Sequence, residues 1–329
     1  HYAASMAAIQ LGKHVYCEKP MCHSIYEIRR LTEAARDAKV ATQLGNFGRS
    51  GEGIRLTCEW IWDGAIGPVR EVHAFGDAGP EWTTFRDRPT DTPPVPAGLD
   101  WDLWLGPAAS RPYHPAYAPF NWRGWWDFGG GGLADMACHN LDPAFWALKL
   151  GFPDSVEASR CEATKETTPH ASIVHYEFPA RGDMPAVKLH WYDGGLLPQR
   201  PEELEPDRKL GERGNGIIFV GDKGKIMCPG WSGTPRLIPE TAMQAYKRPA
   251  KTLPRSKGHH RDWIDACKGN GQTSANFDIV GTMNEAIFMG VIAVRTGEKL
   301  HWDGPNMRCT NVPAANEYVR PVYREGWSL

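Results

Sequence analysis

The sequence has no excess of charge of either sign. Its 37 Lys and Arg residues are balanced by 39 Asp and Glu residues, which leaves a net charge of −2. Proteins that bind nucleic acid carry a basic surface, so this balance argues against a nucleic-acid partner. The longest strongly apolar stretch, around Ala286–Val294, is too short to span a bilayer, and we expect no membrane partner.

Paired cysteines are also missing. The eight cysteines are scattered, and none forms the C-x-x-C spacing of zinc or thioredoxin-like sites. In a chain of 329 residues, scattered cysteines are typical of reduced, buried thiols. The sequence therefore predicts no metal site.

The glycine loops that bind nucleotide phosphates are absent as well. Neither G-x-G-x-x-G after a strand nor G-x-x-x-x-G-K-[ST] occurs in the sequence. The chain begins at His1 without an initiator Met, shows no signal peptide, and enters a helical pattern at once. We interpret it as N-terminally truncated, and we expect a cytoplasmic protein without excluding export.

What is present fits a folded protein of one large or two ordinary domains, since 41% of residues are hydrophobic and 23% are charged. The first sixty residues alternate between helix and strand, which predicts part of a doubly wound parallel sheet. The predicted elements are a helix at Ala3–Leu11, a strand at His14–Cys17, a helix opened by the Ser24/Glu27 capping box, a strand at Val40–Leu44 and a helix at Ile54–Trp62.

After Pro68 the pattern changes, which divides the chain into residues 1–67 and residues 68–329. A long Pro-, Gly- and Trp-rich segment, Gly76–Phe128, predicts an ordered loop system over a cavity, and residues from Trp302 onward read as irregular. Successive strands predict a mainly antiparallel sheet. The predicted strands are Val69–Phe75, Ser155–Ala163, Ala171–Phe178, Ala186–Tyr192, Gly216–Val220 and Lys225–Cys228, and the predicted helices are Leu133–Leu150, Pro239–Tyr246, His259–Lys268 and Phe277–Thr296.

The first chemical signal is Glu18-Lys19-Pro20, at the carboxyl end of a predicted strand. Ligands of open parallel sheets bind outside these strand ends. Pro20 keeps Lys19 out of the helical region, which defines where the lysine side chain starts. Lys19 is either a group that binds or deprotonates a substrate hydroxyl or an exposed lysine in a turn.

The second signal is the run Gly129–Gly132 followed by Asp135, His139 and Asp142, which share one helical face at i, i+4 and i+7. Asp135 could orient the imidazole of His139, and a neutral His139 could take the proton of an alcohol. Three other interpretations use the same residues: a core histidine satisfied by an aspartate, a metal site that lacks a third ligand, and a phosphate loop of the wrong pattern.

Several segments resemble the Gfo/Idh/MocA oxidoreductases in family order. They are the segment from His1-Tyr2-Ala3 through Glu18-Lys19-Pro20, the strand and turn Ala41–Asn46, the glycine run with Asp135 and His139, the segment Trp122–Phe128, and Arg295–Asp303. The resemblance implies a Rossmann domain, of which about 90 preceding residues are missing at about 30 per β–α unit. It also implies a second α/β domain with an open, mostly antiparallel sheet.

The resemblance further implies bound NAD or NADP and a carbohydrate substrate. Lys19, Asp135 and His139 match the family's catalytic positions, and His1, Glu18, Pro20 and Asn46 join Lys19 as cofactor-binding candidates. Arg123, Trp125 and Trp126 precede the glycine run, so they either line the substrate cavity above His139 or pack a loop. A homo-oligomer, dimer or tetramer, is expected by resemblance.

Three functions fit these residues. The first is oxidation or reduction at a sugar or polyol hydroxyl, with hydride transfer to or from NAD(P). The second is a redox-neutral glycosidase or lyase that passes through a keto-sugar intermediate, and the third is a carbohydrate-binding fragment without turnover. A parallel sheet that lacks its opening strands would expose an apolar edge, so we also expect the isolated chain to associate.

Overall fold

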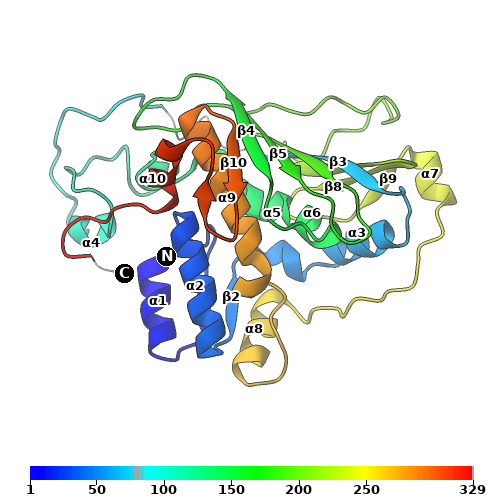
Figure 1. The fold of residues 1–329 in the computed structure, drawn as a ribbon, viewed down its shortest axis with the longest axis horizontal. Helices are drawn as coiled ribbons and strands as arrows, with labels where there is room; N and C mark the ends of the chain where they lie inside the picture. The colour runs from blue at the N-terminus through cyan, green and yellow to red at the C-terminus, as the bar shows by residue number, and fades with distance from the viewer. Residues whose placement is uncertain (78–81, 83, 328–329) are drawn as a thin grey trace.

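A computed structural model describes residues 1–77, 82 and 84–327, and it arranges them as two layers joined by one long helix, α9 (Phe277–Thr296) (Figure 1). The predicted loop system over Gly76–Phe128 includes residues 78–81 and 83, which lie outside the described residues. Within the described part of that segment, α4 (Trp101–Leu105) and the 3-10 helix η3 (Asn121–Gly124) are regular.

The first layer is a parallel strand pair flanked by helices. Strand β1 (Val15–Cys17) pairs in parallel with β2 (Thr42–Leu44), with Val15 beside Thr42 and Cys17 beside Leu44. The predicted alternation of helix and strand is therefore confirmed. The helices of this layer are α1 (Tyr2–Gln10), α2 (Ile25–Ala38), η1 (Phe47–Ser50) and α3 (Glu52–Trp62).

Local signals explain where α1 ends and α2 begins. Gly12 has a φ of 67° just beyond α1, in the conformation that glycine adopts without steric cost. The Ser24 hydroxyl accepts a hydrogen bond from the Glu27 amide at 3.2 Å, as predicted. The Glu27 carboxylate accepts from the His23 amide at 2.9 Å, one residue before the donor that a regular capping box uses.

The second layer is a nine-stranded sheet in the order β11-β10-β4-β5-β6-β3-β7-β8-β9. Every adjacent pair is antiparallel except β3 with β6, which confirms the mostly antiparallel sheet. The strands are β3 (Val69–Phe75), β4 (Ser155–Arg160), β5 (Ser172–Phe178), β6 (Val187–Tyr192), β7 (Gly216–Gly221), β8 (Gly224–Pro229), β9 (Arg236–Ile238), β10 (Leu300–Asp303) and β11 (Arg308–Cys309).

The two ends of this sheet were not predicted. Strand β9 pairs with β8 and was absent from the predicted set, and the tail from Trp302 is not irregular. Trp302 lies in β10, which pairs with both β4 and β11. The 3-10 helix η4 (Pro313–Ala315) and α10 (Asn316–Val319) follow. Strands of two to four residues are too short to show an alternating pattern, so only pairing reveals them.

The predicted single helix Leu133–Leu150 is wrong. The structure has two helices, α5 (Gly131–Asn140) and α6 (Asp142–Ala147), which meet at Leu141. Pro143 stands in the first turn of α6, where its missing N–H is not needed. Asp142 therefore opens α6, and Asp135 and His139 lie on α5.

Helix α9 is the longest of the described helices, and most of its residues are buried. It is apolar enough to cross a membrane by length and composition alone, but 83% of that window is buried inside the protein. It packs against α2 and β2 on one side and against α5, β4 and β5 on the other. A helix that is apolar on all sides belongs in a core, and this one joins the two layers.

Residues late in the sequence complete the first layer. The Leu44 amide donates to the Ala275 carbonyl at 2.9 Å, and the Gln43 side chain donates to the His259 carbonyl at 2.6 Å. Helix α8 (His259–Cys267) therefore lies beside β2, while α7 (Glu240–Ala245) lies at the β9 edge (Figure 1). The division at residue 67 stays a prediction about sequence, because the layer around β1 and β2 also contains segments near residues 259 and 275.

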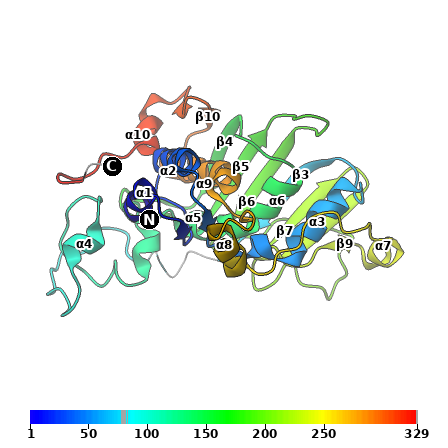
Figure 2. The ribbon, with the colours of Figure 1, turned by 90° about the horizontal axis from the view of Figure 1, so that it is seen from below.

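The nine-stranded sheet has two different faces (Figure 2). Val72 and Ala74 of β3 are buried on the face covered by helices, whereas Glu71 and His73 point to the other face and are half-buried. We call the second face the outer face. Near β7 and β8 it carries a small apolar cluster of Phe75, Leu204, Ile218, Met227 and Ile238.

The packing of α9 on β5 can be tested at Gly290. An added Cβ there would collide with the Tyr176 hydroxyl and lie 2.8 Å from Leu133 Cδ2. Alanine usually stabilises a helix interior by about 1 kcal/mol over glycine, but overpacking a core costs about 1–3 kcal/mol. We expect Gly290→Ala to lower the free energy of unfolding in urea. Gly151→Ala is the control, because an added Cβ meets nothing within 4 Å. Equal stability of the two variants would contradict this packing.

Candidate functional site

Lys19 connects the two layers. It follows β1, and its Nζ donates to the Asp135 carboxylate at 2.9 Å and to the Asp135 backbone carbonyl at 3.0 Å. The partner lies 116 residues further along the chain, on α5. The Lys19–Pro20 peptide bond is cis. The lysine and aspartate side chains are 21% and 11% exposed, so the ion pair is largely shielded from water.

Asp135 holds a second cation. Arg123 Nε donates to the same carboxylate oxygen at 3.2 Å, and Arg123 Nη1 donates to the Phe120 carbonyl at 3.0 Å. The guanidinium lies over the Phe120 and Trp122 rings, with centroid distances of 4.3 and 4.5 Å. Two cations on one carboxylate oxygen form a charged centre between the end of β1 and the start of α5.

His139 lies one helical turn beyond Asp135, and its ring is buried, with 4% exposure. Its Nδ1 has no hydrogen-bond partner among the described residues. Burial, assisted by the charge of Lys19, lowers the pKa of His139 to about 4, although Asp135 acts in the opposite direction. The imidazole is therefore neutral at pH 7 and able to accept a proton.

The predicted contact between Asp135 and His139 is not formed. The Asp135 carboxylate binds Lys19 and Arg123, and no hydrogen bond joins it to the His139 ring among the described residues. A cationic partner outcompetes a neutral imidazole for a carboxylate because charge-assisted hydrogen bonds are stronger. Asp135 thus orients the lysine, and the Phe47 ring, 5.7 Å from His139 between centroids, packs against the imidazole.

Asp142 belongs to a separate buried network. Its carboxylate accepts from Arg49 Nη1 and from Asn46 Nδ2, the latter at 2.8 Å. Burial raises the pKa of Asp142, while Arg49 opposes the shift. Asn46, predicted to contact the cofactor, therefore uses its amide nitrogen on Asp142, and its Oδ1 is buried without a partner among the described residues.

The remaining cofactor candidates lie at the ends of β1 and β2. The His1 ring bonds the Pro20 carbonyl at 2.7 Å, and Glu18 is exposed. The Glu18 carboxylate packs so closely on Gly45 that an added Cβ would collide with it. These two strand ends form the edge where ligands of parallel sheets bind.

A small pocket of about 100 Å³ lies beside this centre. Pro20, His23, Trp122, Arg123 and Asp135 are among the residues that line it. Lys19 and His139 do not line it, so Asp135 connects the pocket to the lysine. The pocket is smaller than a typical ligand site of about 300–1,000 Å³.

Trp125 and Trp126, which the sequence offered either as substrate contacts or as loop packing, do not line this pocket. They are 1% and 3% exposed. Their indole N–H groups donate to the Ala116 carbonyl at 2.9 Å and to the Thr164 carbonyl at 3.0 Å. Their role is loop packing, the alternative that the sequence left open. Arg123 does line the pocket, and its contact with a substrate stays a prediction.

Sequence reasoning missed the half-buried Trp122 and Phe128, which line the pocket, and Phe47. Trp122 stands in the same aromatic run as Trp125, and nothing in that run distinguishes a wall residue from a buried one. Phe47 follows Asn46 in η1 and had no signal of its own.

The residues present fit the nicotinamide end of NAD(P). The Asn46 Oδ1 and His139 Nδ1 atoms are buried without partners among the described residues, as expected where a ligand supplies the missing hydrogen bonds. Lys19 and Glu18 are the charged groups at this edge. The sequence has no glycine fingerprint, so the residues that would hold the pyrophosphate are not identified in it.

The parallel sheet, the mixed sheet and a lysine, carboxylate and histidine between them define the architecture of an NAD(P)-dependent oxidoreductase. Two family models match in the corresponding order. Residues 1–46 match the Gfo/Idh/MocA oxidoreductase family, NAD-binding Rossmann fold, and residues 61–178 match the C-terminal alpha/beta domain of the same family. The chain belongs to the Gfo/Idh/MocA oxidoreductase family.

A sequence relative is 1,5-anhydro-D-fructose reductase of Ensifer adhaerens, 26% identical over 152 residues. The match covers 45% of this chain and 34% of the reductase, so the chain matches about a third of that protein's length.

Two solved structures share the fold, each over 92% of this chain. The WlbA dehydrogenase from Bordetella pertussis, in complex with NADH and UDP-GlcNAcA, has a TM-score of 0.57 at 18% identity, over 76% of its own chain. An inositol dehydrogenase homologue from Azotobacter vinelandii, with NADH and myo-inositol, has a TM-score of 0.52 at 15% identity, over 75% of its chain.

The buried histidine predicts a pH dependence of stability. Above the ordinary pKa of 6.5 neither state binds a proton at His139; between 6.5 and about 4 only the unfolded state does, so stability falls as the pH falls. Between about pH 7 and about pH 4.5 the parent loses unfolding free energy through this group. We expect His139→Gln to remove roughly 2 kcal/mol of that loss, measured by urea unfolding. His301→Gln, at an exposed position, should keep the parental dependence. An unchanged dependence in His139→Gln would contradict the assignment.

The tryptophans predict a split between stability and binding. Trp125→Ala empties a buried site and should cost about 3–5 kcal/mol of unfolding free energy in urea. Trp122→Ala, at a half-buried pocket wall, should cost much less and should raise the KM of the NAD(P)-loaded protein. A raised KM with unchanged stability for Trp125→Ala would return that residue to the substrate site.

Proposed function

We propose that this chain carries the catalytic centre of an oxidoreductase that moves a hydride between NAD(P) and a CH–OH group of a sugar or polyol. The family supports the cofactor class, and the relatives that are named as a fructose-derivative reductase and an inositol dehydrogenase homologue support the substrate class. We further propose that the protein acts as a homo-oligomer in the cytoplasm.

One observation carries the proposal. Lys19 binds Asp135, one helical turn before the neutral, buried His139, and the charge of Lys19 contributes to the lowered pKa of that histidine. An alcohol that is oxidised loses a hydride and a proton, so the site needs a proton acceptor and a group that binds the hydroxyl oxygen. These two side chains supply both.

Lys19 has one N–H left for the substrate. Its ammonium has three donors, and two of them bind the carbonyl and the carboxylate of Asp135. The third can donate to the substrate hydroxyl oxygen, which lowers the pKa of that hydroxyl. Asp135, which also binds Arg123, keeps the ammonium in place, so Asp135 positions the lysine rather than the imidazole.

His139 accepts the hydroxyl proton. A neutral imidazole has one unprotonated nitrogen, and the absence of a protein partner on Nδ1 among the described residues leaves the ring uncommitted. Bound NAD(P) supplies the hydride acceptor.

Three substitutions in the intact, NAD(P)-loaded protein test these roles. Loss of a general base typically lowers the rate about 10²–10⁴-fold, so His139→Ala should lower kcat by that factor while cofactor binding survives. Lys19→Ala should lower kcat and raise KM together, because it contacts the hydroxyl. Asp135→Asn should have an intermediate effect, because it weakens the hold on Lys19. Cofactor fluorescence titration and steady-state rates measure both quantities.

The control is His301→Ala, at an exposed position of β10, which should turn over like the parent. Near-parental turnover of His139→Ala with complete loss in Lys19→Ala would make Lys19 the base. Turnover of a glycoside without net NADH release would favour the redox-neutral lyase or glycosidase, since only net oxidation accumulates NADH.

A further inference from the structure

Three histidines form a row across the outer face of the nine-stranded sheet. His73 of β3 is directly opposite His190 of β6, and His190 is directly opposite His175 of β5. Neighbouring strands are about 4.8 Å apart, so the rings are within contact distance. The His73 and His190 rings stack at 5.1 Å between centroids. Glu71, two residues before His73, points to the same face.

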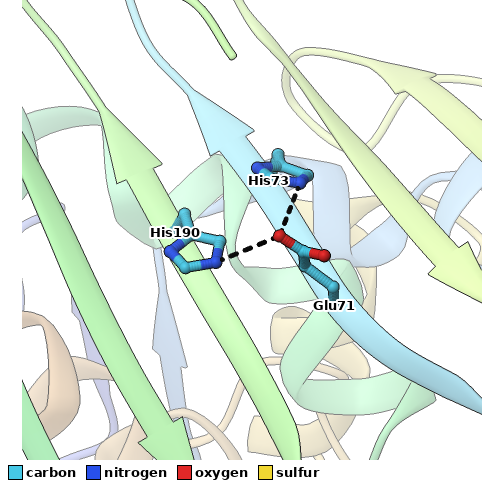
Figure 3. Close-up of side chains that lie close together, drawn as sticks. All are labelled: Glu71, His73 and His190. Carbon is cyan, nitrogen blue, oxygen red and sulfur yellow. Dashed lines mark ion pairs between the residues drawn. The ribbon is translucent and has the colours of Figure 1, made fainter. Parts of the chain in front are cut away.

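One carboxylate oxygen of Glu71 lies between two ring nitrogens. Glu71 Oε1 is 3.1 Å from His73 Nε2 and 3.3 Å from His190 Nε2, and the three atoms lie within 4.8 Å of one another (Figure 3). In a tetrahedral site with bonds of about 2.0–2.1 Å, two ligand atoms are about 3.3 Å apart. The Glu71 oxygen already lies at this distance from both nitrogens.

The other nitrogen of each histidine already has a partner. His73 Nδ1 lies 3.1 Å from the Tyr192 hydroxyl, and His190 Nδ1 lies 2.6 Å from His175 Nδ1. A histidine that binds a metal through Nε2 usually engages Nδ1–H in a hydrogen bond, which orients the ring and selects the tautomer. Tyr192 and His175 are placed to accept these two hydrogen bonds.

The three side chains differ in how far solvent reaches them. The side chains of His73 and His190 are 20% and 15% exposed, while Glu71 is 43% exposed. The site is therefore enclosed on the sheet side and open to solvent on the other.

We propose that Glu71, His73 and His190 form a binding site for a divalent transition metal, of which Zn²⁺ fits best, with Tyr192 and His175 orienting the two histidines. Two imidazoles and one carboxylate are a common ligand set for Zn²⁺, and three protein ligands leave a fourth position for water. Mg²⁺ and Ca²⁺ are not expected to bind, because they prefer oxygen ligands. This site is separate from Lys19 and His139, so it does not depend on the proposed function.

The sequence prediction of no metal site considered only clusters along the chain. Glu71 and His73 show strand spacing, but His190 lies more than a hundred residues away, and only the parallel pairing of β3 with β6 places it beside His73.

The test is a ZnCl₂ titration of the tag-free, chelator-stripped chain by isothermal calorimetry, with Co²⁺ as a spectroscopic probe. We expect one Zn²⁺ per chain and visible absorption typical of four-coordinate Co²⁺. His73→Gln and His190→Gln, which remove a ligand, should each weaken Zn²⁺ binding more than 100-fold. Tyr192→Phe removes only an orienting partner and should weaken binding about 10-fold.

His301→Gln on β10 of the same sheet is the matched control and should bind Zn²⁺ like the parent. Circular dichroism of each variant shows whether the fold is retained. Tyr192→Phe keeps the aromatic ring, so it still tests the site if the histidine variants fail to fold. Parental Zn²⁺ binding in the double variant His73→Gln/His190→Gln, or an absence of stoichiometric binding in the parent, would overturn the proposal.

Discussion

Burial of the apolar helix α9 is the constraint that sets the relative positions of the two layers. The helix begins where the Asn276 side chain accepts from the Ile279 amide at 3.0 Å, and it ends at Gly297, which has a φ of 73°. Between these caps almost every side of it is covered, by α2 and β2 in the first layer and by α5, β4 and β5 in the second. Removing it would expose both cores to water.

An ion pair defines how α9 is rotated against α2. Arg29 donates to both oxygens of Glu285 at 2.7 and 2.6 Å, and Glu285 is 3% exposed. Burial raises the pKa of Glu285 despite the opposing effect of Arg29. A buried pair adds little net stability, but its two parallel hydrogen bonds permit one orientation only. The apolar contacts hold the layers together, and this ion pair specifies their relative orientation.

The position of the candidate site around Lys19 and Asp135 follows from this orientation of the two layers. The glycines before α5 allow the helix to approach α9 closely, since a Cβ on Gly130 would lie 3.0 Å from Val291 Cγ2. The first turns of α5 then face the end of β1, where Asp135 meets Lys19. Asp135 and His139 lie one turn apart on α5 but have different surroundings. Asp135 binds two cations, whereas the His139 ring is enclosed and its Nδ1 has no partner among the described residues. The histidine row lies on the outer face of the sheet and takes no part in these contacts.

The sequence by itself determined the features that depend on neighbours along the chain. The strand Val69–Phe75, the helix Phe277–Thr296, the Ser24 cap and the i, i+4 spacing of Asp135 and His139 all follow from local periodicity and local hydrogen bonds. The family resemblance added the pairing of Lys19 with the α5 residues. Short strands at the sheet ends had too few residues to show a period, and Pro143 was overlooked as a helix start.

Only the tertiary structure decided which partners each polar or aromatic group has. Asp135 bonds Lys19 and Arg123 instead of His139, and Asp142 bonds Arg49. Trp125 is buried although Trp122 in the same run lines a pocket. His73 meets His190 across a parallel strand pair. In each case the contact joins segments brought together by packing, and local pattern carries no information about which distant group will arrive, because that depends on strand register and helix rotation in the folded core.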